Sequence, residues 1–351
     1  MYNSAVRSAR HVALCFLAIF AVLAPAGAFA ANSAVIVMYH RFGESKYPHT
    51  NTTVEQFKAH LSELKDGDYV VKPIPEIVAA IRSGEALPEK TVGISIDDAF
   101  LSVYRVGWPM LQKAGLPFTL FVATEPLDRR FPGYMSWDQL RELVKAGVTI
   151  GSQTASHLHM PMESESRNLE DLRTSNDRFK KELGFVPKMI AYPYGEYSLA
   201  VGKITREVGF DVGFGQHSGV IYKNSDFLYL PRFAFNEAFG DVQRFRLAIR
   251  ALPFKVSDVT PQDPYLKGKQ NPPPFGFTVD KESARGLSRV ACYATRQGKI
   301  NVERLGDRRI EVRALQAFPA GRTRMNCTLL EKDGRWRWLG MQFLVPKPGR
   351  N

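Results

Sequence analysis

Apolar runs and helix-like stretches alternate along the chain from Ser33 to about Phe254. Short apolar runs of this kind predict buried strands, and apolar residues at helical spacing predict helices that cover them. We expect strands at 35–39, 91–96, 118–123, 148–151, 188–191, 212–214 and 228–230, and helices at 53–66, 103–114, 136–146, 164–183 and 199–208. The alternation of strand and helix predicts parallel strands with crossover helices.

The pattern changes after residue 254. Residues 255–275 are rich in proline and polar residues, which predicts an extended linker. Residues 276–351 carry short β-like runs without a clear helix, so we expect a small β-rich C-terminal domain. Strands are expected at 277–279, 290–294, 309–314, 325–330 and 336–345.

The last of these runs contains two tryptophans that alternate with arginines. On a strand, Trp336 and Trp338 share one face and Arg335 and Arg337 the other. The tryptophans either form the core of the small domain, which we favour, or stack on sugar rings.

The N-terminal 30 residues have the pattern of a secretory signal peptide. Arg7 and Arg10 precede an apolar stretch at 12–23, and Ala28-Phe29-Ala30 has the small-x-small form of a cleavage site. The apolar stretch is shorter than the roughly 20 residues of a membrane-spanning helix, so we favour cleavage after Ala30 over an uncleaved anchor. Export across the inner membrane to the periplasm is therefore expected.

Export affects the interpretation of the cysteines and of the charge. Cys292 and Cys327 remain after cleavage, and in an oxidising compartment they either pair or stay as buried thiols.

The full chain carries a net charge of +12, and residues 256–351, with 18 Lys+Arg and 9 Asp+Glu, contribute +9 of it. This basic end indicates an anionic glycan or a membrane surface as a partner, or simply a solvated surface; nucleic acid is not expected.

Polar residues follow five of the expected strands. In a barrel of parallel strands, the C-terminal strand ends share one face, where active sites lie. The residues are His40, Asp97-Asp98, Gln153 with His157, Tyr192-Pro193-Tyr194-Gly195, and Gln216-His217.

Adjacent aspartates at a strand end repel each other unless a cation or a proton compensates their charge. One explanation is a metal site, in which Asp98 is a ligand and Asp97 a base toward bound water. The alternative is a pair of helix N-cap residues before Ala99–Tyr104.

Three motifs, in order and separation, resemble those of the polysaccharide deacetylases (NodB-type, carbohydrate esterase family 4). They are Ser95-Ile96-Asp97-Asp98-Ala99, Gly151-Ser152-Gln153-Thr154-Ala155-Ser156-His157, and Ala191-Tyr192-Pro193-Tyr194-Gly195. Met38-Tyr39-His40 resembles the branch that deacetylates poly-N-acetylglucosamine. The resemblance covers roughly residues 33–240 and implies a distorted (β/α) barrel with fewer than eight strands in a catalytic domain at 31–254.

The resemblance also implies roles for the motif residues. Asp97 corresponds to the general base, and Asp98 and His157 to ligands of a divalent metal, usually Zn, with Co, Ni or Mn as other candidates. Tyr194 lies where the family holds the acetate oxyanion. His40 corresponds to the acid that protonates the leaving amine, and His217 competes for that role.

Three positions depart from the family pattern. Ala99 replaces a glycine, which is a mild change if its φ is negative. The arginine by which many relatives orient the catalytic aspartate is absent from the third motif. Gln153 replaces the first histidine ligand, and an amide oxygen is a weaker ligand for zinc than imidazole. His159 is two residues from His157 and would need a rearranged loop to replace it.

Together these features predict an exported, metal-dependent hydrolase that removes N-acetyl groups from a hexosamine-containing polysaccharide. Because of Gln153, the main alternative is a glycan-binding protein with a degenerate, inactive site. A third reading is hydrolysis of a different acyl group. Metal-activated acetate release distinguishes the first reading from the second.

Overall fold

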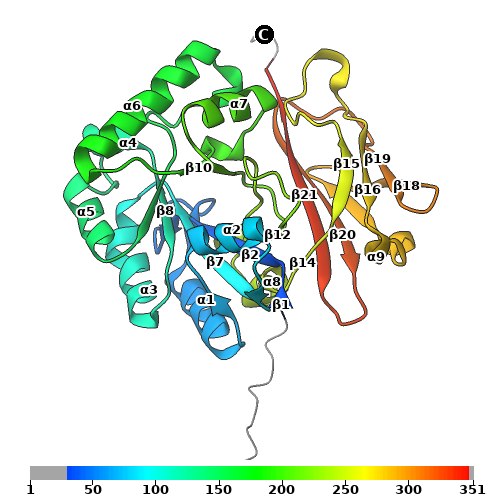
Figure 1. The fold of residues 1–351 in the computed structure, drawn as a ribbon, viewed down its shortest axis with the longest axis horizontal. Helices are drawn as coiled ribbons and strands as arrows, with labels where there is room; N and C mark the ends of the chain where they lie inside the picture. The colour runs from blue at the N-terminus through cyan, green and yellow to red at the C-terminus, as the bar shows by residue number, and fades with distance from the viewer. Residues whose placement is uncertain (1–29, 348–351) are drawn as a thin grey trace, which may run out of the picture.

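Two sheets dominate the computed structural model, which describes residues 30–347 (Figure 1). The expected signal segment lies outside the described residues apart from Ala30. In Figure 1 the first sheet, with its helices, forms one half of the molecule, and the second, C-terminal sheet stands beside it. No helix among residues 30–347 is long and apolar enough to cross a membrane.

The first sheet is built from parallel strands in the order β11-β10-β9-β8-β7-β2. Its strands are β2 (Ser33–Tyr39), β7 (Thr91–Asp97), β8 (Thr119–Val122), β9 (Thr149–Ser152), β10 (Met189–Ala191) and β11 (Val212–Phe214), with β5 (Val70–Val71), β12 (Ile221–Tyr222) and β13 (Phe233–Ala234) attached. Strands β2 and β7 are buried almost throughout, as expected for strands covered on both faces.

The segment from Leu230 to Ala234 closes this sheet into a distorted barrel. Leu230 forms a parallel bridge with Phe214 of β11, and four residues later Ala234 of β13 pairs in parallel with Met38 of β2. One irregular segment therefore joins the two edges of the sheet. The predicted barrel with fewer than eight strands is confirmed, although 228–230 is a bridge rather than a regular strand.

Helices cover the outside of the barrel. Their bounds are α1 (Val54–Asp66), α2 (Ile74–Ser83), α3 (Trp108–Ala114), α4 (Thr124–Asp128), α5 (Trp137–Lys145), α6 (Glu165–Leu183), α7 (Leu199–Glu207) and α8 (Val242–Ile249). Thr53 and Ser136 cap α1 and α5 through complete capping boxes, which explains why these helices begin where the sequence predicts. The helix predicted at 103–114 begins as a π-helix, η1 (Val103–Gly107).

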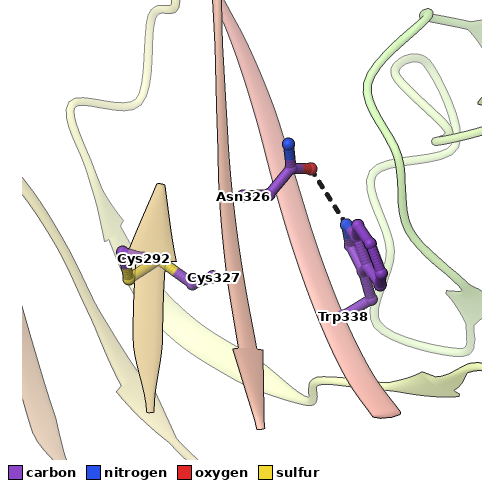
Figure 2. The surroundings of a disulfide bond; sticks show 4 residues. All are labelled: Cys292, Asn326, Cys327 and Trp338. Carbon is purple, nitrogen blue, oxygen red and sulfur yellow. Dashed lines mark hydrogen bonds between the residues drawn. A yellow bond between two sulfur atoms is a disulfide. The ribbon is translucent and has the colours of Figure 1, made fainter. Parts of the chain in front are cut away.

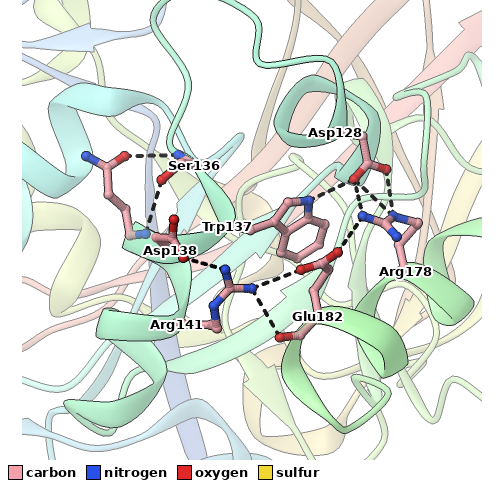
Figure 3. Close-up of polar contacts among 8 residues, drawn as sticks. Asp128, Ser136, Trp137, Asp138, Arg141, Arg178 and Glu182 are labelled. Carbon is pink, nitrogen blue, oxygen red and sulfur yellow. Dashed lines mark hydrogen bonds and ion pairs between the residues drawn. The ribbon is translucent and has the colours of Figure 1, made fainter.

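Charged contacts connect α4, α5 and α6 on the outer surface (Figure 3). Arg178 of α6 donates to both carboxylate oxygens of Asp128, at 2.6–2.9 Å, and to Glu182 at 2.7 Å. Glu182 also accepts from Arg141 of α5 at 2.9 Å. This network fixes the layer of helices that carries α6, whose inner face supports the site described below.

The C-terminal sheet has the order β14-β21-β20-β17-β18-β19-β16-β15. Its strands are β14 (Leu252–Pro253), β15 (Val256–Thr260), β16 (Phe275–Val279), β17 (Ala291–Ala294), β18 (Gly298–Leu305), β19 (Arg309–Arg313), β20 (Gly321–Leu330) and β21 (Trp336–Val345). A short α-helix, α9 (Lys281–Ala284), and two 3-10 helices, η5 (Gly268–Gln270) and η6 (Leu287–Arg289), interrupt them. The stretch expected as a linker thus contains β15, which pairs with β16 at the edge of the sheet.

Cys292 and Cys327 form a disulfide between β17 and β20, where the two residues lie directly opposite each other (Figure 2). Trp338 of β21 donates its indole N–H to Asn326, and its ring meets Phe233 of the barrel edge-on at 5.3 Å. It therefore packs between the two sheets and not in the core of the C-terminal one. Arg337, on the opposite face, is buried in ion pairs with Glu331 and Glu282.

Candidate active site

The chemistry-bearing residues gather where the barrel strands end. Asp97 is the last residue of β7, and His40 follows β2, its parallel neighbour. The histidine Nε2 lies 4.0 Å from the Asp97 Oδ2. The expected acid and the expected base therefore face the same point.

A fully buried arginine, which the sequence motifs did not indicate, holds Asp97. Arg232 donates from Nη1 and Nη2 to the two carboxylate oxygens at 2.7 and 2.8 Å, and both side chains are wholly inaccessible to solvent. Its Nε donates to the carbonyl of Gly215 at 3.0 Å. Such a bidentate pair fixes the orientation of the carboxylate. Each oxygen retains a lone pair for a further partner.

Arg232 lies in the segment that closes the barrel, between the bridge to β11 and strand β13. It thus replaces the orienting arginine that is missing from the third motif. One feature of the sequence could have indicated Arg232: it is the one charged residue in the apolar run Phe227–Phe235. A charge in such a run is costly unless it is paired.

Asp98 and His157 converge as the motifs predict. The His157 Nε2 lies 3.3 Å from the Asp98 Oδ1. Burial alone raises the pKa of Asp98, but the close contact with the His157 ring, with the nearby His40, outweighs it and lowers that pKa to about 2. Burial alone lowers the pKa of His157, and its contact with Asp98 reverses this and raises it.

Gln153 makes contacts that differ from those expected of a metal ligand. Its side chain is fully buried, and its Oε1 accepts the backbone N–H of Asp98 at 2.9 Å. The remaining amide group, Nε2, is buried without a hydrogen-bond partner. Because an amide NH2 donates and does not bind metals, Gln153 in this arrangement positions Asp98.

A divalent cation fits between Asp98 and His157. Two donors that each lie about 2.0–2.1 Å from a tetrahedral ion are separated by about 3.3 Å, which is the separation of the Asp98 and His157 atoms. The Asp98 Oδ1 is moreover buried without a hydrogen-bond partner, a costly state that an ion relieves. Among residues 30–347, no group of three or more His, Cys, Asp or Glu side chains surrounds such a site. An ion bound here would therefore have Asp98 and His157 as protein ligands, and water or substrate would complete its shell.

The backbone of all three motifs is left-handed at several residues. Positive φ values occur at Asp98 (76°), Ala99 (51°), Thr154 (68°), His157 (56°) and Tyr194 (60°). The mild effect expected at Ala99 required a negative φ, so that expectation is wrong. Residues other than glycine occupy this region at an energetic cost and persist where the surroundings hold them.

Helix α6 holds the second motif. Asp171, which is buried, accepts the backbone N–H groups of Ala155 and Ser156 at 2.9 and 3.2 Å and the Ser156 hydroxyl at 2.6 Å. The sequence indicated only a long polar helix here. Its buried acidic residue shapes the loop that carries His157.

Tyr194 lies beside the candidate metal ligands. Its ring stacks on His159 at 4.1 Å and meets the edge of His157 at 4.6 Å. His159 in turn contacts the buried Glu196 at 2.7 Å. His159 is therefore engaged by Tyr194 and Glu196 and does not take the place of the missing ligand.

His217 does not fit the role of the acid. Burial lowers its pKa to about 3, and the positive charges of Arg232 and Arg324 act in the same direction. Its ring packs against Tyr229 at 4.3 Å. A neutral imidazole has no proton to give a leaving amine as an acid near neutral pH.

The residues of this site lie in a region that matches a known family. Residues 84–213 match the family model described as polysaccharide deacetylase, and this range includes all three motifs. This part of the chain therefore resembles a polysaccharide deacetylase domain. The matched range begins before β7 and ends within β11, so it spans the strands that carry Asp97, Asp98 and His157.

Relatives and solved structures extend this likeness beyond the matched range. A poly-beta-1,6-N-acetyl-D-glucosamine N-deacetylase of Staphylococcus aureus is 26% identical over 227 residues, covering 57% of this chain and 78% of the relative. The structure of IcaB from Ammonifex degensii matches with a TM-score of 0.55 and 25% identity, covering 63% of this chain and 99% of the other. The fold is also that of the Streptococcus pyogenes deacetylase PplD (TM-score 0.58, 21% identity, 62% and 98% covered). More than a third of this chain has no counterpart in either structure.

Proposed function

We propose that the protein is an exported deacetylase that hydrolyses the N-acetyl groups of a poly-N-acetylglucosamine-type polysaccharide with the help of a divalent metal ion. The family consists of hydrolases of amide bonds in acetylated polysaccharides. The observation that carries the proposal is the convergence of an oriented carboxylate, a candidate metal pair and a histidine at one end of the barrel. The named substrate of the Staphylococcus aureus relative supports the substrate class.

Each side chain has a task in this reaction. Asp98 and His157 would hold the ion, which supplies Lewis-acid polarisation when bound. Asp97, oriented by Arg232, accepts the proton of the attacking water. The Tyr194 N–H donates to the oxygen that becomes negative as water adds to the acetyl carbon. His40 then donates a proton to the nitrogen as the carbon–nitrogen bond breaks, so that acetate and a free amine leave.

Export and a surface role for the C-terminal domain belong to the proposal. The Cys292–Cys327 disulfide supports export, because such bonds persist in oxidising compartments such as the periplasm. The basic residues after 255 would favour an anionic glycan or a membrane surface.

Acetate release from β-1,6-linked N-acetylglucosamine oligomers tests the function. The purified protein is assayed with Zn, Co, Ni or Mn, with Asp97→Asn as the matched control because it keeps the size of the side chain. We expect metal-stimulated release by the native protein and a loss of at least about 100-fold in the variant. Oligomer binding without release under every metal would establish the glycan-binding alternative instead.

A further inference from the structure

The C-terminal sheet reaches into the third motif. Arg322 of β20 donates from Nη1 to the carbonyl oxygen of Tyr194 at 3.2 Å, and Gln342 of β21 donates from Nε2 to the same oxygen at 3.0 Å. These donors lie 128 and 148 residues further along the chain. Two side chains of the second domain thus bind one backbone carbonyl of the candidate active site.

This carbonyl belongs to a turn that local sequence does not favour. Tyr194 has φ 60° and Gly195 follows with φ 68°. Gly195 cannot be replaced without strain, since an added Cβ would lie 2.5 Å from the backbone nitrogen of Gln216. Glycine adopts this conformation freely, but Tyr194 does so at a cost and needs external contacts to persist in it, and the contacts to its carbonyl are of this kind.

The orientation of Gln342 is set by a neighbour. Its side chain is 2% exposed, and its Oε1 accepts from the Nε of Arg324 at 3.2 Å. A guanidinium only donates hydrogen bonds, so the amide oxygen must face Arg324 and the NH2 must face Tyr194. The donor is therefore in place before any substrate binds.

Arg322 makes a second set of contacts with the same turn. Its guanidinium lies 5.3 Å from the centre of the Tyr194 ring and 3.7 Å from the Glu196 carboxylate. Glu196 contacts His159, whose ring stacks on Tyr194. A continuous set of contacts therefore joins β20 to the side chain that lies against His157.

The two domains meet closely enough to transmit this constraint. Gly340 of β21 lies so near Ser218 that an added Cβ would be 2.1 Å from its carbonyl oxygen. Leu339 forms an antiparallel bridge with Gly219. The position of β21 relative to the barrel is thus fixed by backbone contact beside the site.

We propose that the C-terminal β-domain is part of the active site, with Arg322 and Gln342 as positioning residues that hold the Tyr194 turn so that its N–H meets the developing oxyanion. The catalytic consequence rests on the proposed deacetylase function. The claim that Arg322 and Gln342 keep the turn closed is independent of that function.

Hydrogen exchange and kinetics on the same full-length proteins test the proposal. The variants are Gln342→Glu, which keeps size and the contact to Arg324 but removes the donor, Arg322→Ala, and their combination. Arg322→Lys retains one donor and the charge. Arg313→Ala is the control, since Arg313 pairs with Glu303 and Glu311 of its own sheet.

The amides of Gly195 and Glu196 report on the turn, because they donate to the carbonyls of Tyr192 and Pro193 within it. In the double variant we expect their exchange to accelerate at least tenfold, with β20 and β21 exchanging as before. We expect kcat to fall at least tenfold, the Kd for zinc to stay unchanged, and Arg322→Lys to recover part of kcat. The control should behave as the native protein does.

Unchanged exchange at Gly195 and Glu196 in the double variant would overturn the proposal. Faster exchange throughout β20 and β21 would also overturn it, because that result means unfolding of the domain. If the native protein released no acetate while the turn alone opened in the variant, the deacetylase function would fail and the holding role of the two donors would stand.

Discussion

Arg232 donates two hydrogen bonds, of 2.7 and 2.8 Å, to the carboxylate of Asp97 in the interior of the barrel. The two residues are 135 positions apart in the sequence. The segment that closes the barrel thereby also orients the candidate base. Closure of the fold and assembly of the site are the same structural event. Changes to either residue should consequently affect stability and activity together.

Replacing Arg232 by Met should destabilise the protein by about 3–5 kcal/mol, because it leaves the Asp97 charge buried without its partner. Acetate release should fall at least about 100-fold. Chemical denaturation and steady-state kinetics measure the two effects. In the double variant Asp97→Asn, Arg232→Met, the buried charge is gone, so much of the stability should return while activity stays low. A double variant less stable than Arg232→Met would contradict this account.

Replacing Asp171 by Ala should loosen the loop of the second motif, because three hydrogen bonds to that loop are lost. Residues that orient metal ligands typically contribute 10–100-fold to metal affinity. We expect a loss of that size for zinc by isothermal titration calorimetry. Glu170→Ala, at the exposed neighbouring position, is the control. Equal affinities in the two variants would show that Asp171 does not shape the site.

Acid should destabilise the protein through two buried histidines. Burial lowers the pKa of His60 to about 4 and that of His217 to about 3. Below pH 6.5 the unfolded chain binds protons at these sites and the folded protein does not, so stability falls as the pH falls from 6.5 toward 4. At pH 5 each site should cost about 2 kcal/mol relative to pH 7.

His217→Gln removes one of these sites. The difference in unfolding free energy between pH 7 and pH 5 should therefore shrink by about 2 kcal/mol in this variant, whatever its stability at pH 7. Urea denaturation at both pH values provides the comparison. An unchanged pH dependence would mean that His217 binds protons equally in the folded and unfolded states, and it would restore His217 as a candidate acid.

The disulfide should stabilise the C-terminal domain. Cys292 and Cys327 are separated by 35 residues, and closing a loop of that length restricts the unfolded chain by about 4 kcal/mol. The double variant Cys292→Ser, Cys327→Ser should lose about this much, and the reduced native protein should behave in the same way. Equal stability of oxidised and reduced protein would refute this estimate.

The sequence predicts much of the barrel and its principal residues. Strand ends are local features, so the positions of His40, Asp97 and His157 follow from apolar runs that stop at polar residues. Arg232 escapes such reasoning because its position depends on how the barrel closes. Asp171 lies on a helix whose polar composition hides one buried face.

Contacts between the domains were the least accessible to sequence reasoning. The alternation around Trp338 correctly predicts its strand, but nothing local says that its ring packs on Phe233 of the barrel. Arg322 and Gln342 lie on a strand pair with no motif of its own, and their contacts to Tyr194 depend on docking of one sheet against the other. The φ of Ala99 likewise depends on the surroundings of the first motif.

The number of divalent ions bound per chain tests the central claim most directly. The protein is freed of metal, dialysed against zinc and analysed by elemental analysis, together with Asp98→Asn and His157→Gln, which preserve size at the two candidate ligands. Our account predicts one tightly bound ion in the native protein and at least a tenfold weaker Kd in each variant. Retention of one equally tight ion by both variants would contradict it.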